Sequence, residues 1–389
     1  MEFTVKKSTF QKELGFVQGV IEKKNTIPVL QNIMVRSKGT DSIEIVATDL
    51  DISIYCRCEA EVKKEGAMLI HAKKLFDIVR SLPDSTVHFQ KDEQSWALVK
   101  CERSKFRVVG QSEDNFPNVP EMRSHKVIFP AKSLHYLIEH TIFAITQEES
   151  QRYALNGAQF VLSKNFGRMI TTDGHRLAFV ESKNMKIEDG EDLKVLIPRK
   201  TLTELLKMSA DGFEKKQSDS SKESKEATEV VDVDVMFGKD ENHLFFQIGP
   251  RVLISRTLSG QFPNYELVMP KEINHSMVFD SDKFSSAIRR AALMADEKIK
   301  GVKVRIVDAN VEITARSSEV GDATETLDVD YNGPEINLGF NSQYLLDFLQ
   351  TVGSEQIYFE LKDTQSQAQM RPKDVEDYYY KYVVMPMRI

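Results

Sequence analysis

A short polar turn near the middle of the chain carries the residue types best suited to chemistry. It reads Thr172-Asp173-Gly174-His175-Arg176 and lies between two apolar runs. An Asp and a His two residues apart could act as an acid–base pair if the pKa of each suited a substrate cleft. The sequence offers no nucleophile motif, metal-ligand spacing, glycine-rich phosphate loop or cofactor fingerprint to accompany them. A structural turn, in which Gly174 supplies a positive φ angle, is therefore the favoured interpretation.

The same pattern recurs along the chain, which indicates an internal repeat. Residues 45–52 show the same strand, turn and strand, with Thr48 lying 124 residues before Thr172 (172 minus 48), and a fainter copy lies at 312–316. Three amphipathic helices recur with similar offsets, at 75–79, 202–206 and 345–349. Because two different landmarks give similar offsets, the sequence predicts three copies of one structural unit.

Each repeat is predicted to be α+β, an antiparallel sheet with two helices on one face. The predicted domains are 1–125, 126–274 and 275–389. A helix at 131–146 and a strand at 155–162 are expected to precede the polar turn in the middle repeat, and the chain is expected to end in a strand at 382–387. Residues 211–229 hold a long run without apolar side chains and are predicted to form a flexible insert.

Composition restricts the class of protein. The 389 residues are 41% hydrophobic and 29% charged, with a net charge of −7, so a basic field over the whole protein cannot drive nucleic-acid binding. Three cysteines, Cys56, Cys58 and Cys101, argue against a disulfide framework and favour buried thiols in a reducing compartment. No signal peptide and no apolar run of about 18 residues is present, so a cytoplasmic protein without a membrane partner is expected. No metal site and no cofactor is predicted.

Charge is distributed unevenly along the sequence. Basic residues gather on the predicted helices, whereas acidic residues gather at 319–330 and 363–377. Solvated helix faces would explain this pattern, as they explain most charge runs. The alternative is a set of helices that faces a polyanion while the strands and loops repel it. The residues alone leave these two interpretations open.

Several ordered motifs resemble those of the bacterial sliding clamps, the beta subunits of DNA polymerase III. They are Arg152–Gly157, Thr172–Leu177, Phe262–Tyr265, Gly301–Val302 and Val383–Arg388, and the resemblance extends over the whole chain. It implies a DNA clamp fold with three similar domains, and a head-to-tail homodimer that closes a six-domain ring with the helices inside. Such a ring slides on double-stranded DNA without reading its sequence and is not an enzyme. The implied protein partners are the replicative DNA polymerase, the clamp loader and other proteins with a clamp-binding motif.

The resemblance also implies a partner-peptide pocket between the second and third domains, an apolar cleft with a few polar groups. Its expected walls are Leu155, Thr172, Gly174, His175, Arg176, Leu177, Pro263, Val268, Asn341, Tyr344, Met385, Pro386 and Met387. The expected DNA-binding residues, from two loops and from the basic helices, are Lys24, Lys73, Arg152, Tyr153, Arg199 and Lys200. The chain departs from the family pattern at Ala154, where some relatives carry an aromatic residue, and at Lys24, where Arg is common. Glu149 places an acid near the expected DNA contacts.

Residues 103–108 alternate basic and apolar side chains, as on an edge strand. They are expected to meet the third repeat of a second chain. The predicted interface residues are Arg103, Lys105, Phe106, Arg107, Leu293 and Met294. Two rival functions remain from the residues alone, a hydrolase that uses Asp173 and His175 and a three-repeat scaffold that does not bind DNA. A dimer retained on nicked circular DNA but lost from linear DNA would exclude both.

Overall fold

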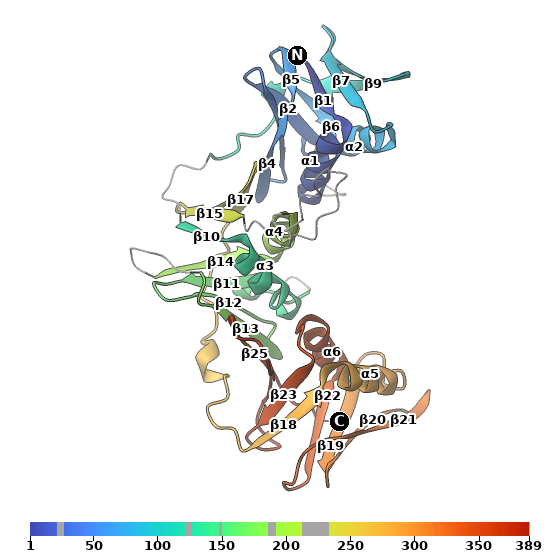
Figure 1. Ribbon diagram of the computed structural model, residues 1–389, viewed down its shortest axis with the longest axis vertical. Helices are drawn as coiled ribbons and strands as arrows, with labels where there is room; N and C mark the ends of the chain where they lie inside the picture. The colour runs from blue at the N-terminus through green and yellow to red at the C-terminus, as the bar shows by residue number, and fades with distance from the viewer. Residues whose placement is uncertain (22–26, 122–126, 148–149, 186–191, 212–232, 389) are drawn as a thin grey trace, which may run out of the picture. The chain divides into compact units, whose positions relative to one another are not determined.

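The computed structural model describes residues 1–21, 27–121, 127–147, 150–185, 192–211 and 233–388. Lys24, Glu149 and all but the first residue of the predicted insert at 211–229 therefore lie outside the described residues. Two compact units divide the chain, Met1–His135 with Lys200–Thr257 (unit 1) and Tyr136–Arg199 with Leu258–Ile389 (unit 2). Each unit thus contains one terminal repeat and part of the middle repeat (Figure 1).

Unit 1 is built on one sheet of thirteen strands. They are β1 (Glu2–Lys6), β2 (Asn32–Lys38), β3 (Ser42–Thr48), β4 (Ile52–Glu59), β5 (Glu61–Lys64), β6 (Ala67–His71), β7 (Thr86–Lys91), β8 (Trp96–Cys101), β9 (Ser104–Gln111), β10 (Val127–Pro130), β15 (Asp234–Lys239), β16 (His243–Ile248) and β17 (Arg251–Arg256). Their order is β10-β15-β16-β17-β4-β3-β2-β6-β9-β8-β7-β1-β5. Strand β17 pairs with β4, so the first and middle repeats share a continuous sheet.

Unit 2 contains two sheets. Their strands are β11 (Gly157–Leu162), β12 (Gly167–Thr172), β13 (Arg176–Ser182), β14 (Leu193–Pro198), β18 (His275–Asp280), β19 (Gly301–Val307), β20 (Asn310–Ser317), β21 (Gly321–Asp328), β22 (Ile336–Asn341), β23 (Gln356–Leu361), β24 (Ala368–Pro372) and β25 (Tyr378–Val384). The first sheet has the order β14-β11-β12-β13-β25-β24-β23-β18 and the second β21-β20-β19-β22. Here β13 pairs with β25, which joins the middle repeat to the third as β17 joins it to the first. Every pairing between these named strands is antiparallel, as predicted.

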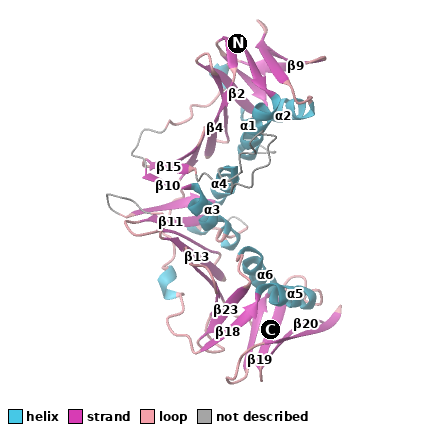
Figure 2. Ribbon diagram, viewed as in Figure 1, coloured by secondary structure: helices cyan, strands magenta, loops and turns pink. Residues whose placement is uncertain are grey.

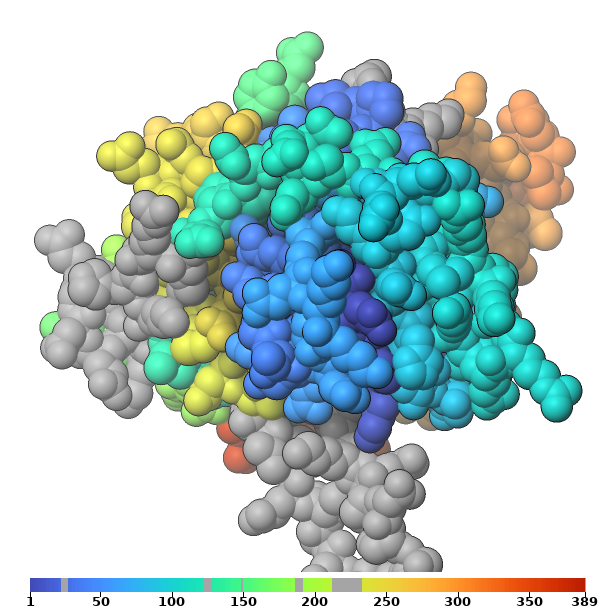
Figure 3. All heavy atoms as spheres, turned by 90° about the horizontal axis from the view of Figure 1, so that it is seen from above, coloured from blue at the N-terminus to red at the C-terminus, as the bar shows by residue number. Residues whose placement is uncertain are grey.

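Two helices accompany each repeat, and apolar spacing explains why they pack. The helices are α1 (Lys7–Val20), α2 (Ala72–Ser81), α3 (Ala131–Glu139), α4 (Arg199–Asp211), α5 (Ser281–Ala292) and α6 (Ser342–Thr351). In α1 the buried Phe10, Leu14 and Val17 recur every three or four residues, which places them on one face. Helices α1 and α2 pack together, as do α5 and α6, against the strands of their own repeats (Figure 2). In the view from above, the blue and cyan atoms of the first repeat face the viewer (Figure 3).

The predicted helix at 131–146 is too long. Helix α3 ends at Glu139, and a 3-10 turn, η3 (Ile142–Ala144), follows it. The backbone carbonyls of this stretch accept from other side chains. Thr171 Oγ1 donates to Thr141 O at 2.6 Å, and Arg199 Nη1 donates to Ile145 O at 3.2 Å. These bonds satisfy carbonyls that a continued helix would have used internally.

Two predicted strands also have different limits. Leu155 lies in a 3-10 turn, η4 (Tyr153–Asn156), and the strand predicted at 155–162 begins only at Gly157. Gly157 approaches the partner strand closely, because a Cβ atom there would lie 2.1 Å from Ile197 O. The final strand, predicted at 382–387, ends at Val384, and Met387 beyond it forms an isolated bridge with Gly339. Pro386 lacks the N–H that a continued ladder would need.

The three cysteines are buried, as the sequence predicts. Cys56 and Cys58 lie on one face of β4, and Cys101 ends β8. Burial raises the pKa of the Cys58 thiol to about 12 and that of Cys56 well above its ordinary value. These thiols are thus protonated and inert at neutral pH.

We expect Cys58 of the native protein to resist Ellman's reagent at pH 8 and to react fully in guanidinium chloride. Because folding raises the pKa, this thiol stabilises the fold fully below its unfolded value near 9 and loses that contribution as pH rises towards 12. The free energy of urea unfolding should therefore fall between pH 8 and 11, and it should fall less in the matched variant Cys58→Ala. Rapid native labelling at pH 8 would contradict the burial argument.

Candidate functional site

The polar turn singled out in the sequence connects β12 to β13 and is held by its own side chains. Thr172 Oγ1 donates to Arg176 O at 2.6 Å and accepts from Gly174 N at 3.1 Å. Asp173 Oδ1 accepts from the backbone N–H groups of His175 and Arg176 at 3.0 and 3.1 Å. Gly174 has a φ of +92°, which a residue with a Cβ rarely adopts. The turn is therefore fixed by local hydrogen bonds, as its residue types predict.

The earlier copy of this turn, between β3 and β4, repeats the same hydrogen bonds. Thr48 Oγ1 donates to Ile52 O and accepts from Leu50 N, both at 3.1 Å. Asp49 Oδ1 accepts from the N–H groups of Asp51 and Ile52 at 3.0 and 2.7 Å. Leu50 has a φ of +82° where the middle repeat carries glycine. The repeat is thus confirmed in hydrogen-bond detail for these two copies. The fainter third copy at 312–316 lies inside β20 and does not form this turn.

Arg176 occupies the buried end of the turn and makes contacts with distant segments. Its side chain is 3% exposed, and its three guanidinium nitrogens all donate. Nε donates to Asp173 Oδ2 at 3.0 Å, Nη1 to Asp347 Oδ2 at 2.5 Å and Nη2 to Phe143 O at 2.6 Å. Burial alone would lower the pKa of this group, but Tyr382, Asp347 and Asp173 together raise it above its ordinary value. Arg176 is therefore a fixed positive charge inside unit 2.

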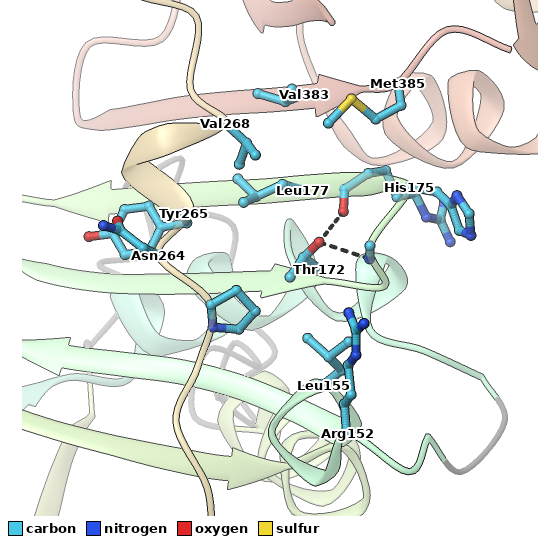
Figure 4. Close-up of a pocket in the computed structure, with 13 residues that line it drawn as sticks. Arg152, Leu155, Thr172, His175, Leu177, Asn264, Tyr265, Val268, Val383 and Met385 are labelled. Carbon is cyan, nitrogen blue, oxygen red and sulfur yellow. Dashed lines mark hydrogen bonds between the residues drawn. The ribbon is translucent and has the colours of Figure 1, made fainter.

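A cavity of about 150 Å³ opens beside this turn. Thirteen residues line it (Figure 4): Arg152, Leu155, Thr172, Gly174, His175, Arg176, Leu177, Pro263, Asn264, Tyr265, Val268, Val383 and Met385. Leu177 and Val383 belong to a buried apolar cluster, against which Tyr265 and Val268 pack. Met385 donates its backbone N–H to His175 O at 2.9 Å, which holds the chain end along the cavity. The cavity is an apolar pocket with a polar rim.

Nine of the thirteen predicted pocket residues line this cavity, and four do not. Asn341, predicted as a wall, caps α6 by accepting from Gln343 N at 2.9 Å. Tyr344 packs against two lining residues, with its ring centre 4.4 Å from the Arg176 guanidinium carbon and 6.4 Å from the centre of the His175 ring. Pro386 and Met387 follow the end of β25 and are half-buried.

The sequence prediction omitted Asn264, Tyr265 and Val383 from the pocket. Asn264 and Tyr265 belong to the motif Phe262–Tyr265, which carries part of the family resemblance, so this motif could have identified them as pocket residues. Val383 is two residues before Met385, and side chains two apart along an extended chain share a face. Arg152 was assigned to DNA alone, yet it also lines the cavity.

The predicted DNA-binding residues occupy different environments. Lys73 on α2 is exposed, and Tyr153 is 66% exposed. Arg199 Nη1 donates to the backbone carbonyls of Ile145 and Thr146 at 3.2 and 3.0 Å. Lys200 forms an ion pair with Asp49 of the earlier turn. The charges of Arg199 and Lys200 are therefore partly compensated within the chain.

The predicted interface residues lie on or beside β9, between β6 and β8 in the order of its sheet, and just after α5. Strand β9 alternates exposed and half-buried side chains. It pairs with β8 at residues 104–109 and with β6 only at Gly110 and Gln111. Arg107 stacks on Trp96 at 4.4 Å and pairs with Asp92 at 3.0 Å. Leu293 is 74% exposed after α5, beside the half-buried Met294. Strand β21 is the outermost strand of its sheet.

This arrangement gives little scope for acid–base chemistry at the polar turn. Both oxygens of Asp173 already accept hydrogen bonds from the turn itself and from Arg176. Among the described residues, no group of three or more His, Cys, Asp or Glu side chains could hold a metal ion. None of the helices described is long and apolar enough to cross a membrane.

Comparison with known proteins gives matches over the full chain. Three family models match in order, the N-terminal domain of the DNA polymerase III beta subunit at residues 1–120, its central domain at 128–264 and its C-terminal domain at 266–388. A beta sliding clamp of Pseudomonas putida is 33% identical, with all of both chains covered. The crystal structure of a Pseudomonas aeruginosa sliding clamp bound to griselimycin has a TM-score of 0.89 at 31% identity, again with all of both chains covered. A C. crescentus clamp with a TM-score of 0.86, 31% identity and the same full coverage carries polyethylene glycol at a region proposed to tether the beta motif.

Proposed function

The chain belongs to the family of bacterial DNA polymerase III beta subunits, the beta sliding clamps, and we propose from this membership how its residues perform the family function. The protein is a DNA polymerase processivity factor that works as a sliding clamp. The proposal concerns the pocket in unit 2, the contact that closes the ring, the DNA contacts and the identity of the partners. We also propose that the protein is not an enzyme and that it acts in the cytoplasm.

The cavity beside the polar turn is the site that tethers partner proteins. The observation that carries this proposal is the convergence of Leu177, Val268, Val383 and Met385 on one apolar pocket with a polar rim. Such a pocket suits a short peptide with apolar anchors and a few hydrogen-bonding groups. The replicative polymerase, the clamp loader and other proteins with a clamp-binding motif would present such peptides. Griselimycin, which the P. aeruginosa relative binds, is a suitable competitor.

The ring closes through two sheet edges that lack strand partners within the described chain. These are the first six residues of β9 in unit 1 and the outer side of β21 in unit 2. Unpaired edges offer hydrogen-bonding groups to another chain. Lys105 on β9 complements Asp322 on β21, whereas Arg107 and Glu325 already pair with Asp92 and Arg290 of their own chain. A contact between β9 of one chain and β21 of the next is heterologous and closes after two chains.

DNA is held by weak phosphate contacts that do not depend on its sequence. The proposed contacts are Lys24, Lys73, Arg152, Tyr153, Arg199 and Lys200, and the last two act with part of their charge already compensated. Because many small contacts add up, loss of one cation should weaken DNA association only slightly. A net charge of −7 is compatible with such binding if the cations face the DNA.

Retention on circular DNA tests this function. After loading by the clamp loader of the same organism, the protein should stay on a nicked circular plasmid through gel filtration and leave it once the plasmid is cut. The variant Phe106→Ala with Met294→Ala should be monomeric near 44.4 kDa by light scattering and should not be retained. Equal retention on linear DNA would overturn encirclement, and a fully dimeric double variant would overturn the interface.

A further inference from the structure

The Arg176 guanidinium lines the partner pocket, and all three of its nitrogens are engaged by groups of the chain itself. Each nitrogen already donates, to Asp173, Asp347 and Phe143 O, at distances between 2.5 and 3.0 Å. Its flat face lies 4.4 Å from the ring centre of Tyr344. A buried charge of this kind is costly to free from its partners. Arg176 therefore holds these three groups in place beside the pocket.

Of the three groups to which Arg176 donates, the most distant in the sequence is Asp347, on α6. Gln343 Nε2 donates to Asp347 Oδ1 at 2.6 Å, so the carboxylate is itself oriented before it meets Arg176. The chain of contacts continues on the pocket side, because Met385 N donates to the carbonyl of His175, the residue before Arg176. The Asp347 carboxylate is thus connected to the pocket rim through one side chain.

We propose that Asp347 is a positioning residue for partner binding: through Arg176 it fixes the rim formed by His175 and Met385 at the spacing that a peptide anchor requires. The inference rests on the proposed peptide pocket and adds a residue that does not touch the peptide. Binding sites depend on such supporting contacts, because small displacements of lining residues cost affinity. Removal of the Asp347 carboxylate takes away one of the two carboxylates that pair with this buried guanidinium, and we expect the turn to shift so that the guanidinium is rehydrated.

The equivalent junction in unit 1 shows that this connection is particular to the pocket. There the same turn faces the equivalent helix α4, but Asp49 pairs directly with Lys200. Residue 52, equivalent to Arg176, is the apolar Ile52, and Glu204, equivalent to Asp347, pairs with Lys207 of its own helix. In both units an ion pair connects the turn to the neighbouring helix. In unit 2 that pair is formed by Arg176, which lines the pocket, whereas in unit 1 it is formed by Asp49 and Lys200. Asp49 therefore supplies a matched control.

The test measures binding of a fluorescein-labelled peptide that spans the clamp-binding motif of the same organism's replicative polymerase, by fluorescence anisotropy. We expect Asp347→Ala to raise the dissociation constant about tenfold, within the usual range of coupling between contacting residues. Asp347→Glu should restore most of the affinity. Asp49→Ala should lower the melting temperature but change the dissociation constant less than about twofold. If Asp347→Ala does not fold, Asp347→Asn should show a smaller loss in the same direction.

A double-mutant cycle separates positioning from general destabilisation. In an Arg176→Met background, Asp347→Ala should cause no further loss of peptide affinity, because the carboxylate acts through the guanidinium. An equal loss in both backgrounds, or equal effects of Asp347→Ala and Asp49→Ala, would overturn the inference. Leu177→Ala tests the pocket itself. If it binds the peptide like the parent, the proposed function fails; if it loses binding while Asp347→Ala does not, only the present inference fails.

Discussion

Deleting residues 385–389 is expected to weaken binding of the polymerase peptide at least a hundredfold, because it removes an anchor of the pocket wall. Met385 lines the cavity and is 37% exposed, so it is available to a ligand. Truncating a dominant residue of such a site costs about 2 kcal/mol or more, and the deletion also releases the rim at His175. Strand β25 ends at Val384 and keeps its pairing with β13, so the sheet should remain.

Two leucine substitutions provide the matched control for this deletion. Leu177→Ala removes a buried side chain from the pocket wall, whereas Leu267→Ala removes one that is 73% exposed and outside the cavity lining. The first should weaken peptide binding strongly and the second should not, when both are measured well below the melting temperature. The deleted protein should still be a dimer by light scattering, near twice 44.4 kDa, because the proposed interface strands β9 and β21 are unchanged. If it binds the peptide within threefold of the parent, the pocket is not the tethering site.

The sequence predicts the polar turn well because its chemistry is local. Thr172, Asp173 and Gly174 specify the turn through bonds to backbone groups at most four residues away. The same local code gives the Thr48 turn, where Leu50 adopts a positive φ without glycine. A residue pattern that specifies a turn locally can be recognised each time it recurs in a single sequence. The number of repeats and the antiparallel pairing could therefore be inferred before the structure was known.

Arg176 shows where sequence reasoning stops. Asp347 is 171 residues away and Phe143 is 33 residues before it, so nothing local predicts that these groups meet. Contacts between distant segments also explain why α3 ends early. The backbone carbonyls that follow the helix accept hydrogen bonds from the side chains of Thr171, Arg176 and Arg199. Helical periodicity at 131–146 describes a preference of the segment, and tertiary hydrogen bonds override it.

Counting charged residues along the sequence does not identify the DNA-binding cations, for a related reason. Arg199 and Lys200 belong to a basic helix in the sequence and were assigned to DNA on that basis. In the structure, Arg199 donates to two carbonyls and Lys200 pairs with Asp49 across the junction with the first repeat. A list of cations cannot show which ones already have an acceptor, because those acceptors come from distant segments. Exposed Lys73 is the simpler candidate for a phosphate contact.

A buried ion cluster in unit 1 supports the second large prediction. Arg251 on β17 is 4% exposed and donates to Glu13 Oε2 at 2.8 Å, to Glu13 Oε1 at 2.6 Å and to Asp211 Oδ2 at 2.6 Å. Its guanidinium also lies 3.7 Å from the ring centre of Phe16. Glu13 is equally buried, at 4% exposed. The cluster therefore joins α1, α4 and β17 through one cation.

Replacing Arg251 by Met should lower the free energy of unfolding by about 3–5 kcal/mol, because Glu13 would remain buried without its counter-charge. Urea unfolding at pH 7 measures this loss. The matched control is Arg256→Met on the same strand, whose cation is 62% exposed and lies 3.6 Å from Asp51, so its loss should stay within about 1 kcal/mol. Equal losses in the two variants would contradict the assignment of a buried cluster.

The pH dependence supplies an independent check on the same cluster. Burial alone would raise the pKa of Asp211, but Lys12 and Arg251 outweigh it and lower the pKa below its ordinary value. A lowered pKa gives stability above the unfolded value near 4 that is lost as pH falls through the folded value. Removing Arg251 should reduce this shift, so the stability of Arg251→Met should depend less steeply on pH between about 5 and 2. Adding Glu13→Gln to Arg251→Met should recover part of the stability at pH 7, because the uncompensated buried charge is then gone.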